Sequence, residues 1–228
     1  MKQFLLTCFL AAAFVLHPVL LPAQQSRAYV RDQISRYGEC KNVAITKHNG
    51  DLMLYGKNGW AATGCPKGLT DALHELNEAE ETINDVQLTE EGDWLVLYGD
   101  NGLRWNDIPY SLEQKLRQFN SNKEKITSVT FNDDGDWIVI TTEHIAASDY
   151  SIQNWLKEGN EEYGQVWAVC LTDDACVAVY ENGFTFRGNV PSDLKQELRE
   201  TSIDVYRLKI AGTAWFFSDG KSRYNYNM

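Results

Sequence analysis

The pattern of apolar and polar positions repeats along the chain with a period of roughly 41 residues, most clearly around residues 92–109. Each unit contains a run of consecutive apolar residues between polar turns. One aligned position of these runs is occupied, in chain order, by Leu52, Trp94, Trp137, Cys176 and Trp215. The successive spacings are 42, 43, 39 and 39 residues. A fixed period of this length predicts a solenoid, a propeller or another array of similar units.

Within each unit we expect three strands. The first alternates apolar and polar residues, as at Val86 and Leu88. The second is apolar on both faces, which predicts that both faces are covered. Asn-Gly pairs at 58–59, 101–102 and 182–183 then favour tight hairpins into a third strand, because both residue types accept a positive φ.

A short helix is expected after the strands, because apolar residues recur there at positions i, i+4 and i+7. These stripes are Leu69, Leu73 and Leu76; Leu112, Leu116 and Phe119; Ile152 and Leu156; and Leu194 and Leu198. The fifth unit has no such stripe after its strands. Val30, Ile34 and Tyr37 supply one near the N-terminus. We therefore expect a helix at about 27–38 to complete the last unit and close a ring, since open arrays usually end in polar caps.

Five units of this element order resemble the pentein, or α/β-propeller, family in repeat length, repeat number and element order across residues 24–228. Pentein enzymes that modify guanidino groups use a cysteine with histidine and acidic residues, and this chain shows no such motif that can be matched residue by residue. The resemblance implies an α+β fold of five βββα repeats, each of about 41 residues, closed into a ring. The alternative is a five-bladed β-propeller with helical insertions, which would require the Leu-x3-Leu stripes to be strands.

The first 23 residues carry a targeting pattern. A single charge precedes a long apolar run, and Ala23 offers a small residue for cleavage. We predict a secretory signal peptide at 1–23 and an exported mature protein, periplasmic or extracellular, in which 24–228 form one domain. A membrane anchor is the alternative, and His17 and Pro18 within the run disfavour it.

Four cysteines follow the leader, and an even number in an exported protein favours disulfides. Cys170 and Cys176 flank a turn and could face each other across one hairpin. Cys176 also stands at the position of the aligned tryptophans. By exclusion Cys40 would pair with Cys65. The alternative is that Cys65 or Cys40 is a catalytic nucleophile.

The third unit breaks the Tyr-Gly-x-Asn-Gly pattern of its neighbours and contains Glu143 and His144 at the same place. A site added to a repeat scaffold would be found where one unit departs from the others. Glu143 and His144 are therefore the candidate catalytic residues, acting as a base or as polar contacts. Drift in an unconstrained turn is the alternative explanation.

Aromatic residues recur at related positions of the third strands, with arginines beside them. The candidate binding residues are Trp60, Trp105, Arg104, Phe186 and Arg187. If these strands face an opening, the rings could stack on a sugar or a peptide. Repeating aromatic positions also suit core packing, and the sequence leaves the choice open.

A net charge of −11 argues against nucleic acid and anionic membranes as partners, because phosphate binding requires clustered Lys and Arg. No metal site or cofactor is predicted: the histidines lack ligand spacing, and the acidic turn at 132–136 lacks the pattern of an EF-hand. The leading hypothesis is an exported, non-enzymatic scaffold that binds a protein or glycan. The alternative is a hydrolase or transferase whose site is dispersed over several units and includes Glu143 and His144.

Overall fold

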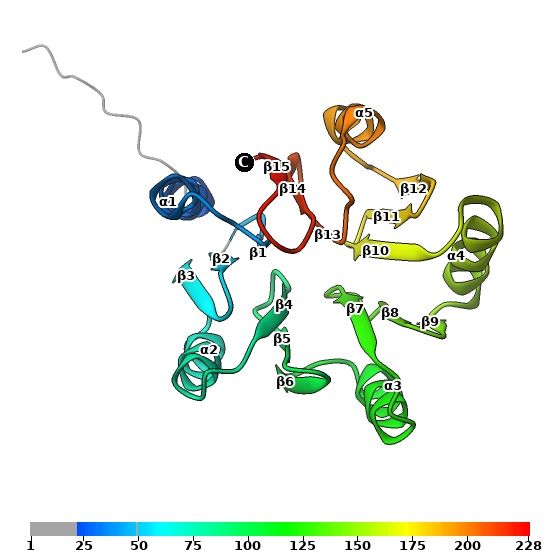
Figure 1. Ribbon diagram of the computed structural model, residues 1–228, viewed down its shortest axis with the longest axis horizontal. Coiled ribbons are helices and arrows are strands. Elements are labelled where there is room, and N and C mark those ends of the chain that lie inside the picture. Colours follow the sequence, from blue (N-terminus) through cyan, green and yellow to red (C-terminus); the bar gives the residue numbers. More distant parts are fainter. Residues whose placement is uncertain (1–21, 49) are drawn as a thin grey trace, which may run out of the picture.

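The computed structural model describes residues 22–48 and 50–228, so most of the predicted leader lies outside the described residues. Five units, each of three strands and one helix, are present, which confirms the predicted α+β repeat (Figure 1). The helices are α1 (Pro22–Tyr37), α2 (Lys67–Glu78), α3 (Tyr110–Ser121), α4 (Tyr150–Tyr163) and α5 (Ser192–Glu200). Among the described residues no helix has the length and apolar content needed to cross a membrane.

Each unit forms its own three-stranded antiparallel sheet, with strands in chain order. The strands are β1 (Asn42–Ala44), β2 (Asp51–Tyr55) and β3 (Gly59–Thr63); β4 (Ile83–Leu88), β5 (Trp94–Tyr98) and β6 (Gly102–Asn106); β7 (Ile126–Phe131), β8 (Trp137–Thr141) and β9 (Ile145–Ala147); β10 (Val166–Leu171), β11 (Ala175–Tyr180) and β12 (Gly183–Gly188); and β13 (Arg207–Ala211), β14 (Ala214–Ser218) and β15 (Tyr224–Asn227). Figure 1 shows the first strands near the centre and the helices outside. Each first strand contacts the first strands of both neighbouring units, and β13 contacts β1.

The helices fill the wedges between adjacent sheets. Leu69, Leu73 and Leu76 of α2 are buried against apolar residues of the first and second sheets. In the same way Val30 and Ile34 of α1 are buried between the first and fifth sheets. The middle strands are therefore covered on both faces, as their apolar runs predict.

Two details of α1 differ from the prediction. The helix begins at Pro22, several residues before the expected start at about 27. Tyr37 is 42% exposed, so it does not belong to the buried stripe. Its ring instead stacks on Tyr55 with centroids 4.1 Å apart. The helix ends at Tyr37 and Gly38 follows at φ +70°, a conformation that favours glycine.

Acidic side chains in the turns after the first strands join neighbouring units. Both carboxylate oxygens of Asp133 accept backbone N–H groups of the preceding unit, from Glu90 at 3.1 Å and from Glu91 at 3.0 Å. The Glu90 carboxylate in turn accepts the N–H groups of Lys47 and His48. The acidic turns therefore bind backbone donors from one unit to the next. The described residues contain no group of three or more His, Cys, Asp or Glu that could hold a metal ion.

Replacing Asp133 with alanine is expected to lower the free energy of unfolding by about 2 kcal/mol, because two backbone donors lose a charged acceptor. Urea titration of the wild type and the variant would measure this change. Asp134→Ala is the matched control, since this neighbouring side chain is exposed and no hydrogen bond of its carboxylate is described. Equal loss in both variants would show that Asp133 matters only through the charge of the turn.

The predicted disulfides are wrong, because all four described cysteines are free thiols. In the β10–β11 hairpin Leu171 pairs with Cys176, and Cys170 pairs with Val177. Successive side chains of a strand point to opposite faces, so Cys170 and Cys176 lie on opposite faces of the sheet. They belong to different apolar clusters.

Cys40 and Cys65 are separated in the same way. Cys40 is buried in the cluster around α1, whereas Cys65 packs against the cluster around α2. Burial raises the pKa of each of these thiols to about 12, although hydrogen bonds to backbone carbonyls act in the opposite direction. Neither thiol has the lowered pKa or the exposure of a reactive nucleophile.

We expect a protein of residues 22–228, purified without reductant and unfolded in guanidinium, to show four thiols per chain with a thiol reagent. The thiols of the folded protein should react far more slowly, because burial hinders access and opposes ionisation. Adding a reductant should leave the melting temperature unchanged. A count of two thiols or none in the unfolded chain would contradict the structure and show that one or both predicted disulfides form.

Candidate functional site

The third unit differs from its neighbours in the hairpin after its second strand. In the second unit this hairpin pairs Tyr98 with Gly102, and the first unit has the same pair of residue types. The tyrosine ring lies so close that a Cβ atom on Gly102 would be 2.4 Å from it. The third unit has Thr141 and His144 at these paired positions. Replacing the tyrosine with a smaller residue therefore accompanies the appearance of a histidine opposite it.

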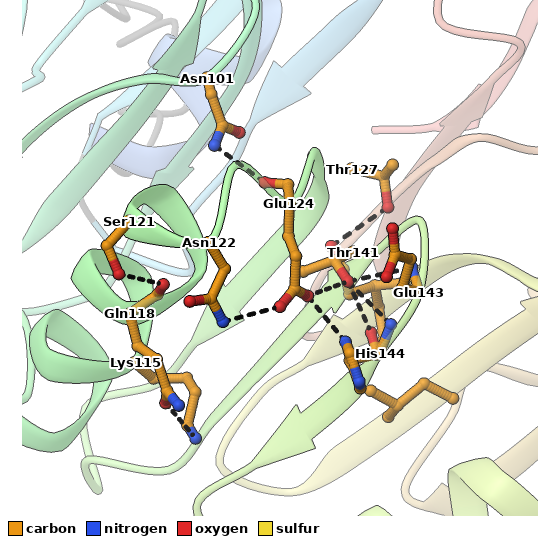
Figure 2. Close-up of polar contacts among 12 residues, drawn as sticks. Asn101, Lys115, Gln118, Ser121, Asn122, Glu124, Thr127, Thr141, Glu143 and His144 are labelled. Carbon is orange, nitrogen blue, oxygen red and sulfur yellow. Dashed lines mark hydrogen bonds and ion pairs between the residues drawn. The ribbon is translucent and has the colours of Figure 1, made fainter.

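Glu124 is the partner of His144. The two side chains meet with 2.8 Å between Nδ1 and Oε2 (Figure 2). Thr141 Oγ1 donates to the same oxygen at 3.1 Å, and Asn122 Nδ2 donates to Oε1 at 3.2 Å. Burial alone would raise the pKa of Glu124, but these hydrogen bonds, that of His144 foremost, hold the pKa below its ordinary value. An ionised Glu124 favours a proton on Nδ1 and leaves Nε2 of the neutral ring as an acceptor.

An open hollow of about 400 Å³ lies beside this pair. Its polar lining includes Thr142, Glu143, Gln153, Lys157, Asn160 and Gln165. Glu143 donates its backbone N–H to Thr141 at 3.1 Å, whereas the histidine bonds to Glu124. The structure thus brings the predicted His144 to a carboxylate, but to a different one. Catalytic roles for Glu143 and His144 stay predictions.

The third strands lie at the outer side of the sheets, beside the helices (Figure 1). Trp60, Trp105 and Phe186 are half-buried and pack against the clusters between sheets. Arg104 forms an ion pair with a glutamate of α2, and Arg187 lies over an indole ring of α4 at 4.9 Å. The predicted binding residues are therefore distributed around the circumference and do not converge. Their binding role stays a prediction.

A different set of residues converges where the first strands begin. Two adjoining hollows of about 570 and 370 Å³ open there and share Asn84, Arg207, Gly220 and Lys221. We call the two together the Arg207 mouth. Residues of all five units line it, among them Lys41, Asn84, Lys125, Trp167 and Arg207. The hollow lined by the acidic turns, at the other ends of the same strands, measures only about 50 Å³.

Arg207 reaches from the fifth unit to two others. Its Nε donates to the Asn84 carbonyl at 3.3 Å, and Nη1 donates to the carbonyls of Thr127 at 3.4 Å and Tyr206 at 2.7 Å. The guanidinium therefore joins the second, third and fifth units. Because these acceptors are neutral, they leave its positive charge uncompensated.

Lys41 is buried in the same region. Its Nζ donates to the carbonyls of Gly56 at 2.7 Å and Lys57 at 2.8 Å. Burial, followed by the positive charge of Arg207, lowers the pKa of Lys41 to about 8, while Glu39 acts in the opposite direction. Two cations thus lie close together in a partly desolvated site, an arrangement typical of functional sites.

Glu124 and the residues of the Arg207 mouth were not predicted from the sequence. A signal for Glu124 exists, because Glu39, Glu81 and Glu124 recur at steps of 42 and 43 residues. Arg207 gives no such signal, since its partners lie 80 and 123 residues away in the chain. Comparison with family models matches no family, and comparison with curated proteins matches no relative.

Proposed function

We propose that this protein is an exported, non-enzymatic ring scaffold that binds a protein or glycan partner at the Arg207 mouth. The observation that carries this proposal is the convergence of residues from all five units on one pair of open hollows. Ligand sites are typically concave, with a few polar groups converging among apolar or aromatic walls. Trp167 and Tyr206 form such a wall, with ring centroids 4.9 Å apart.

Alanine substitution of both Trp167 and Tyr206 tests the proposal. The wild type, the double variant and a control would be screened on a glycan array and against exported proteins of the source cell. Tyr110→Ala with Tyr150→Ala is the control, because it removes two aromatic rings that are each 75% exposed on outer helices. We expect the control to retain the partner and the mouth variant to lose it. Equal binding by the two variants would place the partner elsewhere on the ring.

A hydrolase is the second candidate, and the Glu124–His144 pair is the observation that favours it. A carboxylate that orients an imidazole can prepare it as a general base. Any activity on a panel of ester, amide and glycoside substrates should then fall at least 100-fold in His144→Ala and in Glu124→Gln. His74→Ala is the control, because His74 pairs with Glu78 at 3.3 Å on an exposed helix face. Activity that survives in both site variants would exclude this pair.

A further inference from the structure

Arg207 and Lys41 retain donors that the protein does not use. A guanidinium has five N–H groups and an ammonium has three. The described hydrogen bonds of Arg207 use Nε and Nη1, and those of Lys41 use two carbonyl acceptors. The Nη2 group of Arg207 and one N–H of Lys41 are therefore left for a ligand or solvent. The described acceptors of both cations are neutral carbonyls. The site therefore favours a ligand group with negative charge.

The rim of the mouth adds charges of both signs. Lys125 and Lys221 are exposed and form no ion pair within the described part of the chain. Arg223 pairs with Asp204 at 3.4 Å and with Asp219 at 3.1 Å, so its single charge offsets one of these two acids. The remaining lining acids are Asp100 and Glu39. The mouth is thus richer in free positive charge than the rest of a chain whose net charge is −11.

We propose that the Arg207 mouth binds the carboxylate of an acidic saccharide, with Arg207 and Lys41 contacting the carboxylate and the Trp167–Tyr206 wall contacting the sugar ring. This inference rests on the proposed function and specifies its ligand. A guanidinium presents parallel N–H groups that suit a carboxylate. A flat aromatic wall beside such a charge suits a cyclic ligand with one apolar face and one charged group.

The direct test compares trigalacturonic acid with its methyl ester by calorimetric titration of the full mature protein. Esterification removes the charge and keeps the sugar rings, so the acid should bind at least tenfold more tightly. Arg207→Met and Lys41→Met should abolish this preference. Because Arg207 also joins three units, Lys125→Glu with Lys221→Glu provides a second variant on exposed positions that should weaken binding at least tenfold. Lys67→Glu with Lys115→Glu makes the same charge change on the outer helices α2 and α3 and should leave binding unchanged.

Three results would overturn the inference while leaving the proposed function intact. Equal affinity for the acid and the ester would show that the mouth binds sugars without using the carboxylate. Preferential binding of a poly-glutamate peptide, sensitive to the same rim variant, would make the partner an acidic protein. If neither saccharide binds, but an array or protein partner is lost in the Trp167 and Tyr206 variant, the ligand class is wrong and the mouth is still the site. If no partner depends on the mouth, both the inference and the proposed function fail.

Discussion

A chain of residues 38–228, which lacks α1, is expected to lose cooperative unfolding and to expose apolar surface. The helix α1 contributes Val30 and Ile34, whose exposed fractions are 0% and 2%, to the cluster between the first and fifth sheets. Burial of a side chain of this size contributes about 1.5–3 kcal/mol. Removing the helix would also uncover Phe216 of β14 and Met53 of β2. The combined loss is comparable with the whole stability of a typical domain, about 5–15 kcal/mol.

Polar contacts make the same helix a link between the two ends of the chain. Arg27 Nη2 donates to the carbonyl of Thr46 in the first unit at 2.7 Å and to that of Ala211 in the fifth at 3.4 Å. Arg31 Nη1 donates to the carbonyl of Met228 at 2.8 Å. Together with the burial of Val30 and Ile34, these bonds place α1 in the wedge between the first and fifth sheets.

A milder substitution avoids the ambiguity of a deletion. Ile34→Ala should lower the free energy of unfolding by about 2–5 kcal/mol, because the neighbouring sheets cannot fully close the resulting cavity. Asp32→Ala, at an exposed position of the same helix, should change it by less than about 0.5 kcal/mol. Urea denaturation of both variants gives the comparison. If the truncated chain and Ile34→Ala unfold like the wild type, α1 is an appendage and the array does not depend on it.

The element order could be predicted because local sequence patterns within the units indicate the individual strands, turns and helices. The apolar run of β5, the Asn-Gly turn and the stripe of Leu112 and Leu116 each predict one element. Because such signals recur in several units, the pattern is not a coincidence of one segment. The N-terminal stripe of Val30 and Ile34 predicts a helix by the same periodicity. The predicted burial of Tyr37 is wrong, because apolar periodicity cannot distinguish a buried ring from one that stacks on the surface.

The disulfide prediction is wrong because of the register of the β10–β11 hairpin. The prediction placed Cys170 and Cys176 opposite each other, but the turn between them sets the pairing one residue away, with Leu171 opposite Cys176. A shift of one residue moves a side chain to the other face of a sheet. Turn length in a hairpin cannot be read with that precision from residues as permissive as Asp and Thr.

The candidate site was only partly predictable for a different reason. His144 was found because the third unit departs from its neighbours at a defined place in the repeat. The recurrence of Glu39, Glu81 and Glu124 marks a repeat position, but it does not identify Glu124 as the partner of His144. Arg207 contacts Asn84 and Thr127 because the fold brings the first strands of three units together. Residues that converge from several units are far apart in the sequence, and only the assembled fold shows that they lie together.

The stability of the wild-type protein relative to Asp51→Asn is expected to rise as the pH falls from 7 to 4. Asp51 is fully buried in β2 and bonds to the helix α1, where Ser26 Oγ donates to Oδ2 at 3.0 Å. The backbone N–H of Thr46 donates to Oδ1 at 3.0 Å, and Arg27 Nε lies 3.8 Å from Oδ2. Burial nevertheless outweighs these contacts and raises the pKa of Asp51 from 3.8 to about 6.

The direction of the effect follows from which state binds the proton more tightly. A carboxyl group whose pKa is higher in the folded state than in the unfolded state favours folding when it is protonated. The cost of the ionised Asp51 is therefore fully present above pH 6 and absent below about pH 4. A pKa raised from 3.8 to about 6 corresponds to about 3 kcal/mol at neutral pH. An asparagine resembles the protonated acid in shape and charge, so it should avoid this cost.

Urea denaturation of the wild type and Asp51→Asn at pH 4, 5, 6 and 7 measures the difference directly. We expect the variant to be more stable by about 3 kcal/mol at pH 7, with the difference falling towards zero at pH 4. Other acidic groups titrate equally in both proteins and cancel from the comparison. Asp32→Asn, on the exposed face of α1, should show no such trend. A difference that stays constant with pH would mean that Asp51 titrates as an ordinary carboxyl group, and that its bonds to Ser26 and Thr46 fully offset its burial.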